Sequence, residues 1–155
     1  MGTGRKGFAS CENGRMPVGP RESLVGLFRT APLRDVTSAY LFGSHAAGRA
    51  HRESDVDVAV LLDWIGYPDS RARFAARLRL MADIGRAVGR PDVDVVILND
   101  APPQFARAIV TRGERVHCAD AEADHAFIRT TLLRAADLEP FLRRTRRVKL
   151  ASIRP

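Results

Sequence analysis

Two short apolar runs joined by a polar segment constrain this chain more than any other feature. Residues 39–62, AYLFGSHAAGRAHRESDVDVAVLL, predict a strand, a turn at Gly43 and Ser44 that opens a short helix, a polar loop and a second strand. Alternate residues of a strand face opposite sides. Asp55 and Asp57 therefore share one face, and the valines between and after them face the core. The segment predicts a carboxylate pair close to a helix-opening turn.

A third carboxylate is expected from a later run. Residues 91–99, PDVDVVILN, predict another strand, in which Asp92 and Asp94 share a face. If this strand lies beside the one that carries Asp55 and Asp57, one of its acids joins the pair. We favour Asp94, because it lies inside the run, whereas Asp92 lies at its start.

The residue types indicate a particular chemistry. Carboxylates that face one another repel unless a positive charge lies between them. Mg²⁺ binds oxygen ligands, typically one or two carboxylates and the phosphates of a substrate. Backbone N–H groups at a helix start, together with the hydroxyl of Ser44, make an anion site. A phosphate site next to metal-binding carboxylates describes a nucleotide–metal active site.

The same residues carry a family resemblance. Gly43-Ser44, followed after ten residues by Asp55-Val56-Asp57, resembles the signature of the DNA polymerase β-like nucleotidyltransferase superfamily. The later stretch DVDVVILNDAPPQFARAIVTRGERVHCAD is similar to the minimal nucleotidyltransferase (MNT) branch. The resemblance covers roughly residues 21–140. It implies an α/β (α+β) nucleotidyltransferase fold, in which helices flank a small mixed β-sheet.

The resemblance also implies roles for individual residues. Asp55, Asp57 and Asp94 would be the catalytic carboxylates and would hold two Mg²⁺ ions, which lie roughly 4 Å apart in such sites. Gly43 and Ser44 would bind the triphosphate of the substrate ATP.

One position departs from the family pattern. The MNT branch usually has an arginine before the glycine that is Gly48 here, and this chain has Ala47 instead. We expect Arg49, two residues later, to contact phosphate in its place.

The resemblance further implies a partner protein. MNT proteins are typically paired with HEPN-domain ribonuclease toxins, and act as antitoxins that transfer AMP to a toxin tyrosine. We therefore expect a Mg²⁺-dependent protein adenylyltransferase antitoxin. Two alternatives remain: a binding module that neutralises its partner by contact alone, and a nucleotidyltransferase that acts on a small molecule or a nucleic acid.

Length and charge bound the organisation. The 155 residues suffice for one domain. We expect a disordered tail at 1–20, a nucleotidyltransferase domain at 21–143 and a basic tail at 144–155. The net charge is +7. Most of it lies at the two ends, since residues 1–20 hold three basic residues and one acidic residue, and 141–155 hold six basic residues and no acidic one. The central part is nearly neutral, which argues against nucleic acid as the main partner.

Other features exclude further classes. Cys11 and Cys118 lie far apart and form no metal-binding cluster, so neither a disulfide framework nor a zinc site is indicated. The N-terminus lacks the apolar segment of a signal peptide, and no apolar run has the length of a membrane span. We expect a soluble, cytoplasmic protein without a membrane partner.

The periodicity of the remaining chain predicts the other elements. Helices are expected at 21–31, 70–89, 104–112 and 122–143, and strands at 38–42, 55–62, 91–99 and 114–118. The expected apolar stripe of helix 70–89 consists of Phe74, Leu78, Met81 and Val88, with its arginines in solvent. The expected buried side of helix 122–143 consists of Phe127, Leu132, Leu133, Leu138 and Phe141. Residues 137–140, which end in a proline, are expected to kink or end that helix.

Two aromatic residues follow the second strand. Trp64 and Tyr67 are candidates for stacking on a nucleobase, and packing against the core is the alternative for both.

Overall fold

A computed structural model of the chain describes residues 19–30, 33, 35–46 and 54–153. The helices are α1 (Pro20–Thr30), α2 (Gly43–Ala46), α3 (Ser70–Val88), α4 (Pro103–Arg112) and α5 (Ala121–Ile153), with a short 3-10 helix, η1 (Leu98–Asp100). The strands are β1 (Val36–Phe42), β2 (Val56–Leu62), β3 (Val93–Ile97) and β4 (Glu114–Cys118). The expected strand 91–99 is thus shorter, and its last residues form η1.

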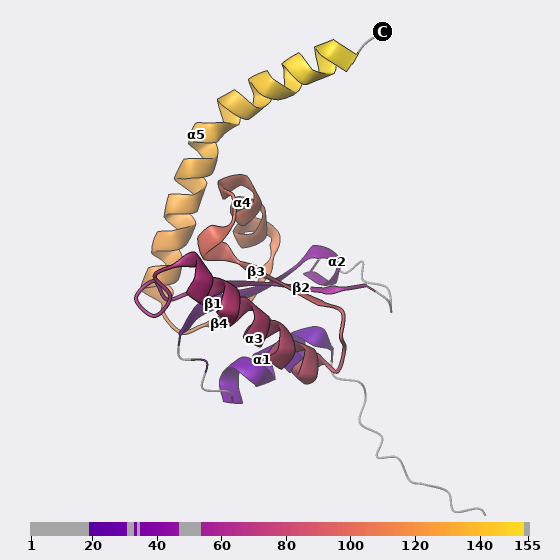
Figure 1. The fold of residues 1–155 in the computed structure, drawn as a ribbon, viewed down its shortest axis with the longest axis vertical. Helices are drawn as coiled ribbons and strands as arrows, with labels where there is room; N and C mark the ends of the chain where they lie inside the picture. The colour runs from indigo at the N-terminus through magenta and orange to yellow at the C-terminus, as the bar shows by residue number, and fades with distance from the viewer. Residues whose placement is uncertain (1–18, 31–32, 34, 47–53, 154–155) are drawn as a thin grey trace, which may run out of the picture.

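The four strands form one mixed sheet in the order β3-β2-β1-β4. Figure 1 shows this sheet between α1 and α3 on one side and α4 and α5 on the other. Strand β1 is antiparallel to both β2 and β4, whereas β2 and β3 are parallel. A parallel pair needs a crossover connection, and α3 supplies it between β2 and β3. The predicted fold, a small mixed sheet flanked by helices, is confirmed.

Helices cover both faces of the sheet. On one face, α1 and α3 pack on the alternate residues of β2 and β3 that include Val58 and Val95. On the other face, α4 and the first turns of α5 pack on residues such as Tyr40, Ala59 and Leu61. Asp57 is two residues before Ala59 and therefore shares this second face, beyond the part that α4 covers.

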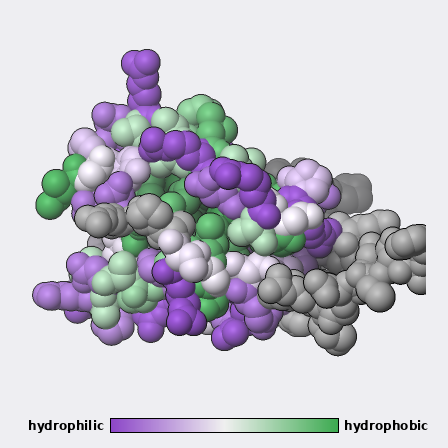
Figure 2. Space-filling view, turned by 90° about the horizontal axis from the view of Figure 1, so that it is seen from below, coloured by the Kyte–Doolittle hydropathy of each residue, from purple (hydrophilic) through white to green (hydrophobic). Residues whose placement is uncertain are grey.

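The side of α1 and α3 is seen in Figure 2, where hydrophilic side chains are interspersed with hydrophobic areas. Within the described part of the chain, no helix combines the length and the apolar character that crossing a membrane requires.

The buried side of α3 differs in part from the expected stripe. Met81 and Val88 pack against the core as predicted, but the other two residues do not. Phe74 and Leu78 are 57% and 52% exposed. The residues that α3 buries are Arg73, Ala76, Leu80 and Ile84. The helix therefore faces the sheet with a stripe that includes the small residue Ala76. The prediction that the arginines of this helix lie in solvent is wrong for Arg73, whose guanidinium is buried and pairs with Asp100 at 2.7 Å. The predicted end of the helix at Gly89 is confirmed, because Gly89 adopts a left-handed conformation there.

Helix α5 is longer than expected and buries other residues. It runs from Ala121 to Ile153 with Pro140 inside it, so the proline does not end it. Figure 1 shows its last part bending away from the body of the molecule. Of the expected buried side, Phe127 packs against the core, but four residues are exposed: Leu132, Leu133, Leu138 and Phe141. The residues that α5 does bury are Asp124, Thr131 and Ala135, which lie over the sheet and α4.

The expected boundaries at 20/21 and 143/144 stay predictions. Most of the expected tail 1–20 lies outside the described residues. Helix α5 passes through 143/144 without interruption.

One buried carboxylate ties α5 to the sheet. Asp124 is fully buried and accepts hydrogen bonds from the hydroxyls of Ser38 and Tyr40 at 2.6 and 2.7 Å, and from the Arg115 guanidinium at 2.8 Å. Burial alone raises the pKa of Asp124, but the bonds from Ser38, Tyr40 and Arg115 together outweigh it and lower the pKa below its ordinary value. The ionised form of Asp124 therefore stabilises the fold.

We expect Asp124→Asn to reduce the free energy of unfolding at pH 7 by about 2–4 kcal/mol, because it removes charge-assisted bonds from a buried site. Since the folded pKa is lowered, the stabilisation is complete above the ordinary value of about 3.9 and is lost as pH falls through the lowered value. Denaturant unfolding at pH 7 and near pH 2.5 measures both effects. The exposed Asp137 is the control: Asp137→Asn should change stability by less than about 0.5 kcal/mol. An equal effect of the two variants at pH 7 would contradict this role of Asp124.

Candidate active site

The site begins where β1 ends against the side chain of Asp57. In the antiparallel register of β1 and β2, Phe42 lies opposite Asp57. The next residue, Gly43, adopts a left-handed φ of 72° and opens the one-turn helix α2. A Cβ atom on Gly43 would lie 2.1 Å from Oδ2 of Asp57. Only glycine therefore allows the backbone to turn this close to the carboxylate.

The sheet also brings the carboxylates together. Asp57 and Asp94 are direct partners in the parallel register of β2 and β3, and Asp55 precedes β2. Asp57 is half-buried, and the other two are exposed. Burial raises the pKa of Asp57, and the negative charges of Asp94 and Asp55 raise it further, while His45 opposes them. The sheet therefore places Asp55, Asp57 and Asp94 near one another, and together they concentrate negative charge.

An arginine that the sequence did not single out contacts one of these carboxylates. Arg77, on α3, pairs with Oδ1 of Asp94 at 2.9 Å. Its Nε also donates to the backbone carbonyl of Val95. Arg77 therefore holds the Asp94 side chain toward α3 and offsets part of the negative charge. Its regular spacing among the other arginines of α3 gave no signal of this role.

The donor set fits Mg²⁺ in part. Among the described residues, no group of three or more His, Cys, Asp or Glu side chains is gathered so that it could hold a metal ion. Asp94 is instead paired with Arg77. Mg²⁺, however, is commonly bound by one or two carboxylates, with waters and substrate phosphates completing its shell. Asp55 and Asp57, with repulsion that a cation would relieve, are donors of that kind.

The predicted phosphate-binding residues lie beside this charge. Gly43 and Ser44 form the start of α2, next to Asp57. The ring Nε2–H of His45 donates to the carbonyl oxygen of Ser54 at 3.1 Å, which ties α2 to the segment before β2. Because α2 has only four residues, an anion placed there would meet backbone N–H groups and the Ser44 hydroxyl rather than the dipole of a long helix. Arg49 lies outside the described residues.

Aromatic residues near the carboxylates come from β1 and α4. The rings of Phe42 and Phe105 meet edge to face, with centroids 5.9 Å apart. Since Phe42 lies opposite Asp57, this pair forms an apolar wall beside the carboxylates. Two aromatic residues 63 positions apart carry no sequence signal that they meet.

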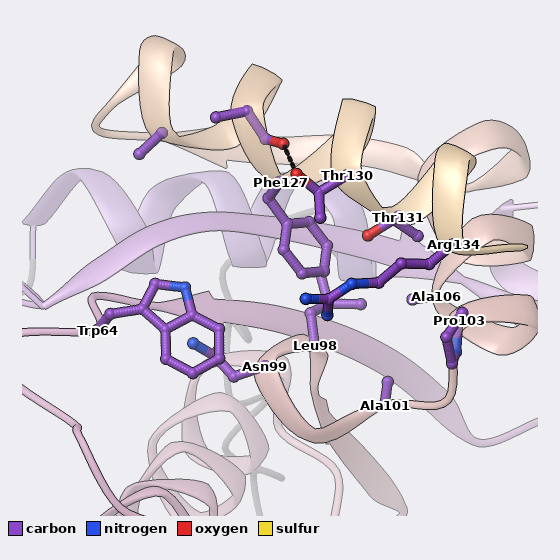
Figure 3. A pocket seen from close by; sticks show the side chains of 12 residues that line it. Trp64, Leu98, Asn99, Ala101, Pro103, Ala106, Phe127, Thr130, Thr131 and Arg134 are labelled. Carbon is purple, nitrogen blue, oxygen red and sulfur yellow. Dashed lines mark hydrogen bonds between the residues drawn. The ribbon is translucent and has the colours of Figure 1, made fainter.

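Trp64 lies far from the carboxylates. It comes after the other end of β2. Because a strand rises about 3.3 Å per residue, Trp64 lies roughly 20 Å along the strand direction from Asp57. There it lines a cavity of about 470 Å³, which Phe127 and Arg134 of α5 enter from the opposite side (Figure 3). Tyr67 packs against the core. The structure therefore favours packing over base stacking for Tyr67 and separates Trp64 from the predicted site.

A glycine turn against clustered carboxylates, on a small mixed sheet, defines a nucleotidyltransferase-type site. The chain belongs to the family described as Polymerase beta, Nucleotidyltransferase, whose model matches residues 23–122. The predicted superfamily membership is confirmed.

Individual relatives refine the similarity. The protein adenylyltransferase MntA of Shewanella oneidensis is 36% identical over 78 residues, which are 50% of this chain and 50% of the relative. The chain thus aligns with about half the length of this curated relative. A crystal structure of a toxin–antitoxin with AMP-PNP is 27% identical, with a TM-score of 0.57, and the match covers 86% of this chain and 97% of that chain. The MNT antitoxin complex with a tri-AMPylated Shewanella oneidensis HEPN toxin has a TM-score of 0.55 at 24% identity, over 86% of this chain and 95% of that chain, which shows the shared fold.

Two glycines allow a matched test of the contact with Asp57. Gly43 and Gly89 have φ values of 72° and 70°, but a Cβ atom on Gly89 meets nothing within 4 Å. We expect Gly89→Ala to cost about 1 kcal/mol of stability from backbone strain alone. Gly43→Ala should cost about 1–3 kcal/mol more, because Asp57 must move. Denaturant unfolding of both variants measures the difference, and equal losses would show that Gly43 is not constrained by Asp57.

Proposed function

We propose that this protein transfers AMP from ATP to a hydroxyl group of a partner protein, a tyrosine of a HEPN-domain toxin, and so acts as an adenylyltransferase antitoxin. The observation that carries the proposal is the left-handed turn at Gly43 against Asp57, with Asp55 and Asp94 adjacent. The name of the adenylyltransferase relative and the AMP-PNP complex of the structural relative support the reaction type. The partner follows from the resemblance of the sequence to the MNT branch.

In this proposal, each group of site residues has its own role in AMP transfer. Gly43 and Ser44 bind the triphosphate through backbone N–H groups and the Ser44 hydroxyl. The acceptor oxygen forms a bond to the α-phosphorus, and the bond from that phosphorus to the bridging oxygen of pyrophosphate breaks. The acceptor proton passes to Asp94. Pyrophosphate leaves on the side of α2. Holding the reactants in line supplies much of the rate enhancement.

We also propose that Asp55 and Asp57 hold Mg²⁺ together with the ATP phosphates, and that Asp94 completes a two-ion site. Bound Mg²⁺ would neutralise phosphate charge and lower the pKa of the acceptor hydroxyl. In the absence of nucleotide, the pairing of Asp94 with Arg77 keeps part of this charge compensated.

We expect Asp57→Asn to reduce AMP transfer by at least about a hundredfold, because it removes a charge from the reacting centre. In the assay, wild type or Asp57→Asn is incubated with Mg²⁺, ATP radiolabelled at the α-phosphate, and the protein encoded by the neighbouring reading frame. The measured quantity is the label transferred to that neighbouring protein. Chelation of the metal should abolish the label in the same way. Wild-type rates from Asp57→Asn would refute the proposed chemistry.

Stability separates loss of chemistry from loss of fold in that variant. The pKa of Asp57 is raised in the folded protein, so its ionised form costs folding free energy. The cost is absent below the ordinary pKa of about 3.9 and complete above the raised value. Asp57→Asn should therefore unfold at an equal or higher denaturant concentration than wild type at pH 7. A marked drop would mean that its inactivity reflects unfolding.

A further inference from the structure

The order of the strands gives the reacting centre two different sides. Helix α2 lies at the end of β1, on one side of Asp57, and β3 with Asp94 lies on the other. In phosphoryl transfer, the attacking and leaving oxygens are roughly in line across the phosphorus. If pyrophosphate leaves toward α2, as the proposed function has it, the acceptor must approach from the side of β3.

A groove lies on that side. It has a volume of about 530 Å³ and runs along β3 between the first half of α3 and the start of α4. Phe74 of α3 and Phe105 of α4 line it from opposite faces of the sheet, and Val96 of β3 lines it on the side of α4. Both phenylalanines are unusually exposed for their size, at 57% and 43%. Large apolar side chains that gather in a groove mark a binding surface.

The groove is continuous with the carboxylates. Arg77 lines it and at the same time pairs with Asp94. Phe105, on its other wall, packs against Phe42, which lies opposite Asp57. A chain segment that lies in the groove would therefore reach Asp94 at its end.

The floor of the groove is the outer edge of the sheet, part of which Arg77 covers. Strand β3 is the outer strand, and the bond from Val56 N–H to the Asp92 carbonyl sets its register with β2. In a parallel ladder, alternate residues bond to the neighbouring strand, so the backbone groups of Val95 point outward. The contact of Arg77 with the Val95 carbonyl agrees with this direction. An outer strand with apolar side chains around it suits an extended peptide segment.

We infer that this groove docks an extended apolar segment of the acceptor protein and delivers its hydroxyl to Asp94. The inference deepens the proposed function and rests on it. It assigns Phe74, Phe105 and Arg77 to recognition of the acceptor, and it leaves ATP binding to the side of α2.

The test compares two neighbouring residues of α3. Phe74→Asp places a charge in the groove. Leu78→Asp makes the same kind of change four residues further on, at a similarly exposed position that does not line the groove. We expect Phe74→Asp to raise the KM for the partner protein at least about tenfold, as loss of an aromatic anchor does. The affinity for ATP should not change, and Leu78→Asp should match wild type in both quantities.

An unchanged KM in Phe74→Asp, or equal increases in both variants, would overturn the inference. A photoreactive benzophenone side chain in place of Phe74 gives an independent measurement of docking with AMP-PNP present. If wild type transfers no AMP, the proposed function fails. The same side chain in place of Leu78 is the control. A cross-link to the partner from position 74 but not from position 78 would then still support docking. No cross-link from position 74 would overturn it.

Discussion

The contact between the backbone of Gly43 and the carboxylate of Asp57 is the constraint on which the rest of the site depends. It requires β1 and β2 to be antiparallel in the register that puts Phe42 opposite Asp57. It also requires glycine, because a Cβ atom would overlap the carboxylate. Once β2 is placed in this way, its parallel partner β3 brings Asp94 level with Asp57. The turn and the carboxylates thus follow from two strand registers.

The electrostatics of the site agree with this arrangement. Burial raises the pKa of Asp57, and the nearby charges of Asp94 and Asp55 raise it further, so the ionised form of Asp57 is held at a cost in folding free energy. The fold relieves only part of it, through Arg77 at Asp94 and the charge of His45 near Asp57. Hydrophobic burial of β2 on α1 and α3 supplies the stability that holds the acids in place. The end of β2 that carries Asp57 thus loses some stability to a concentration of negative charge, which a bound cation would relieve.

Features that depend on neighbouring residues could be predicted from the sequence, whereas features that depend on contacts between distant elements could not. The alternation of Asp55, Val56 and Asp57 is local, so the strand and the shared face of its two acids could be predicted. The burial of the helices is not local. The periodicity of α5 gave its helical form, but not that its later turns extend past the sheet, where Leu138 and Phe141 remain exposed. The pairing of Arg77 with Asp94 depends on how α3 crosses from β2 to β3, which no spacing in the sequence encodes.

The same distinction separates the two sides of the reacting centre. The side that we assign to the nucleotide is built from one contiguous stretch, from β1 through α2 to β2, so its chemistry can be read from a motif. The side that we assign to the acceptor is assembled from α3, β3 and α4, and its aromatic residues lie at positions 74 and 105. A motif search therefore identifies the reaction before it identifies the acceptor. If the groove binds the acceptor as we infer, specificity would depend on how α3, β3 and α4 pack, and it could change while the motif stays constant.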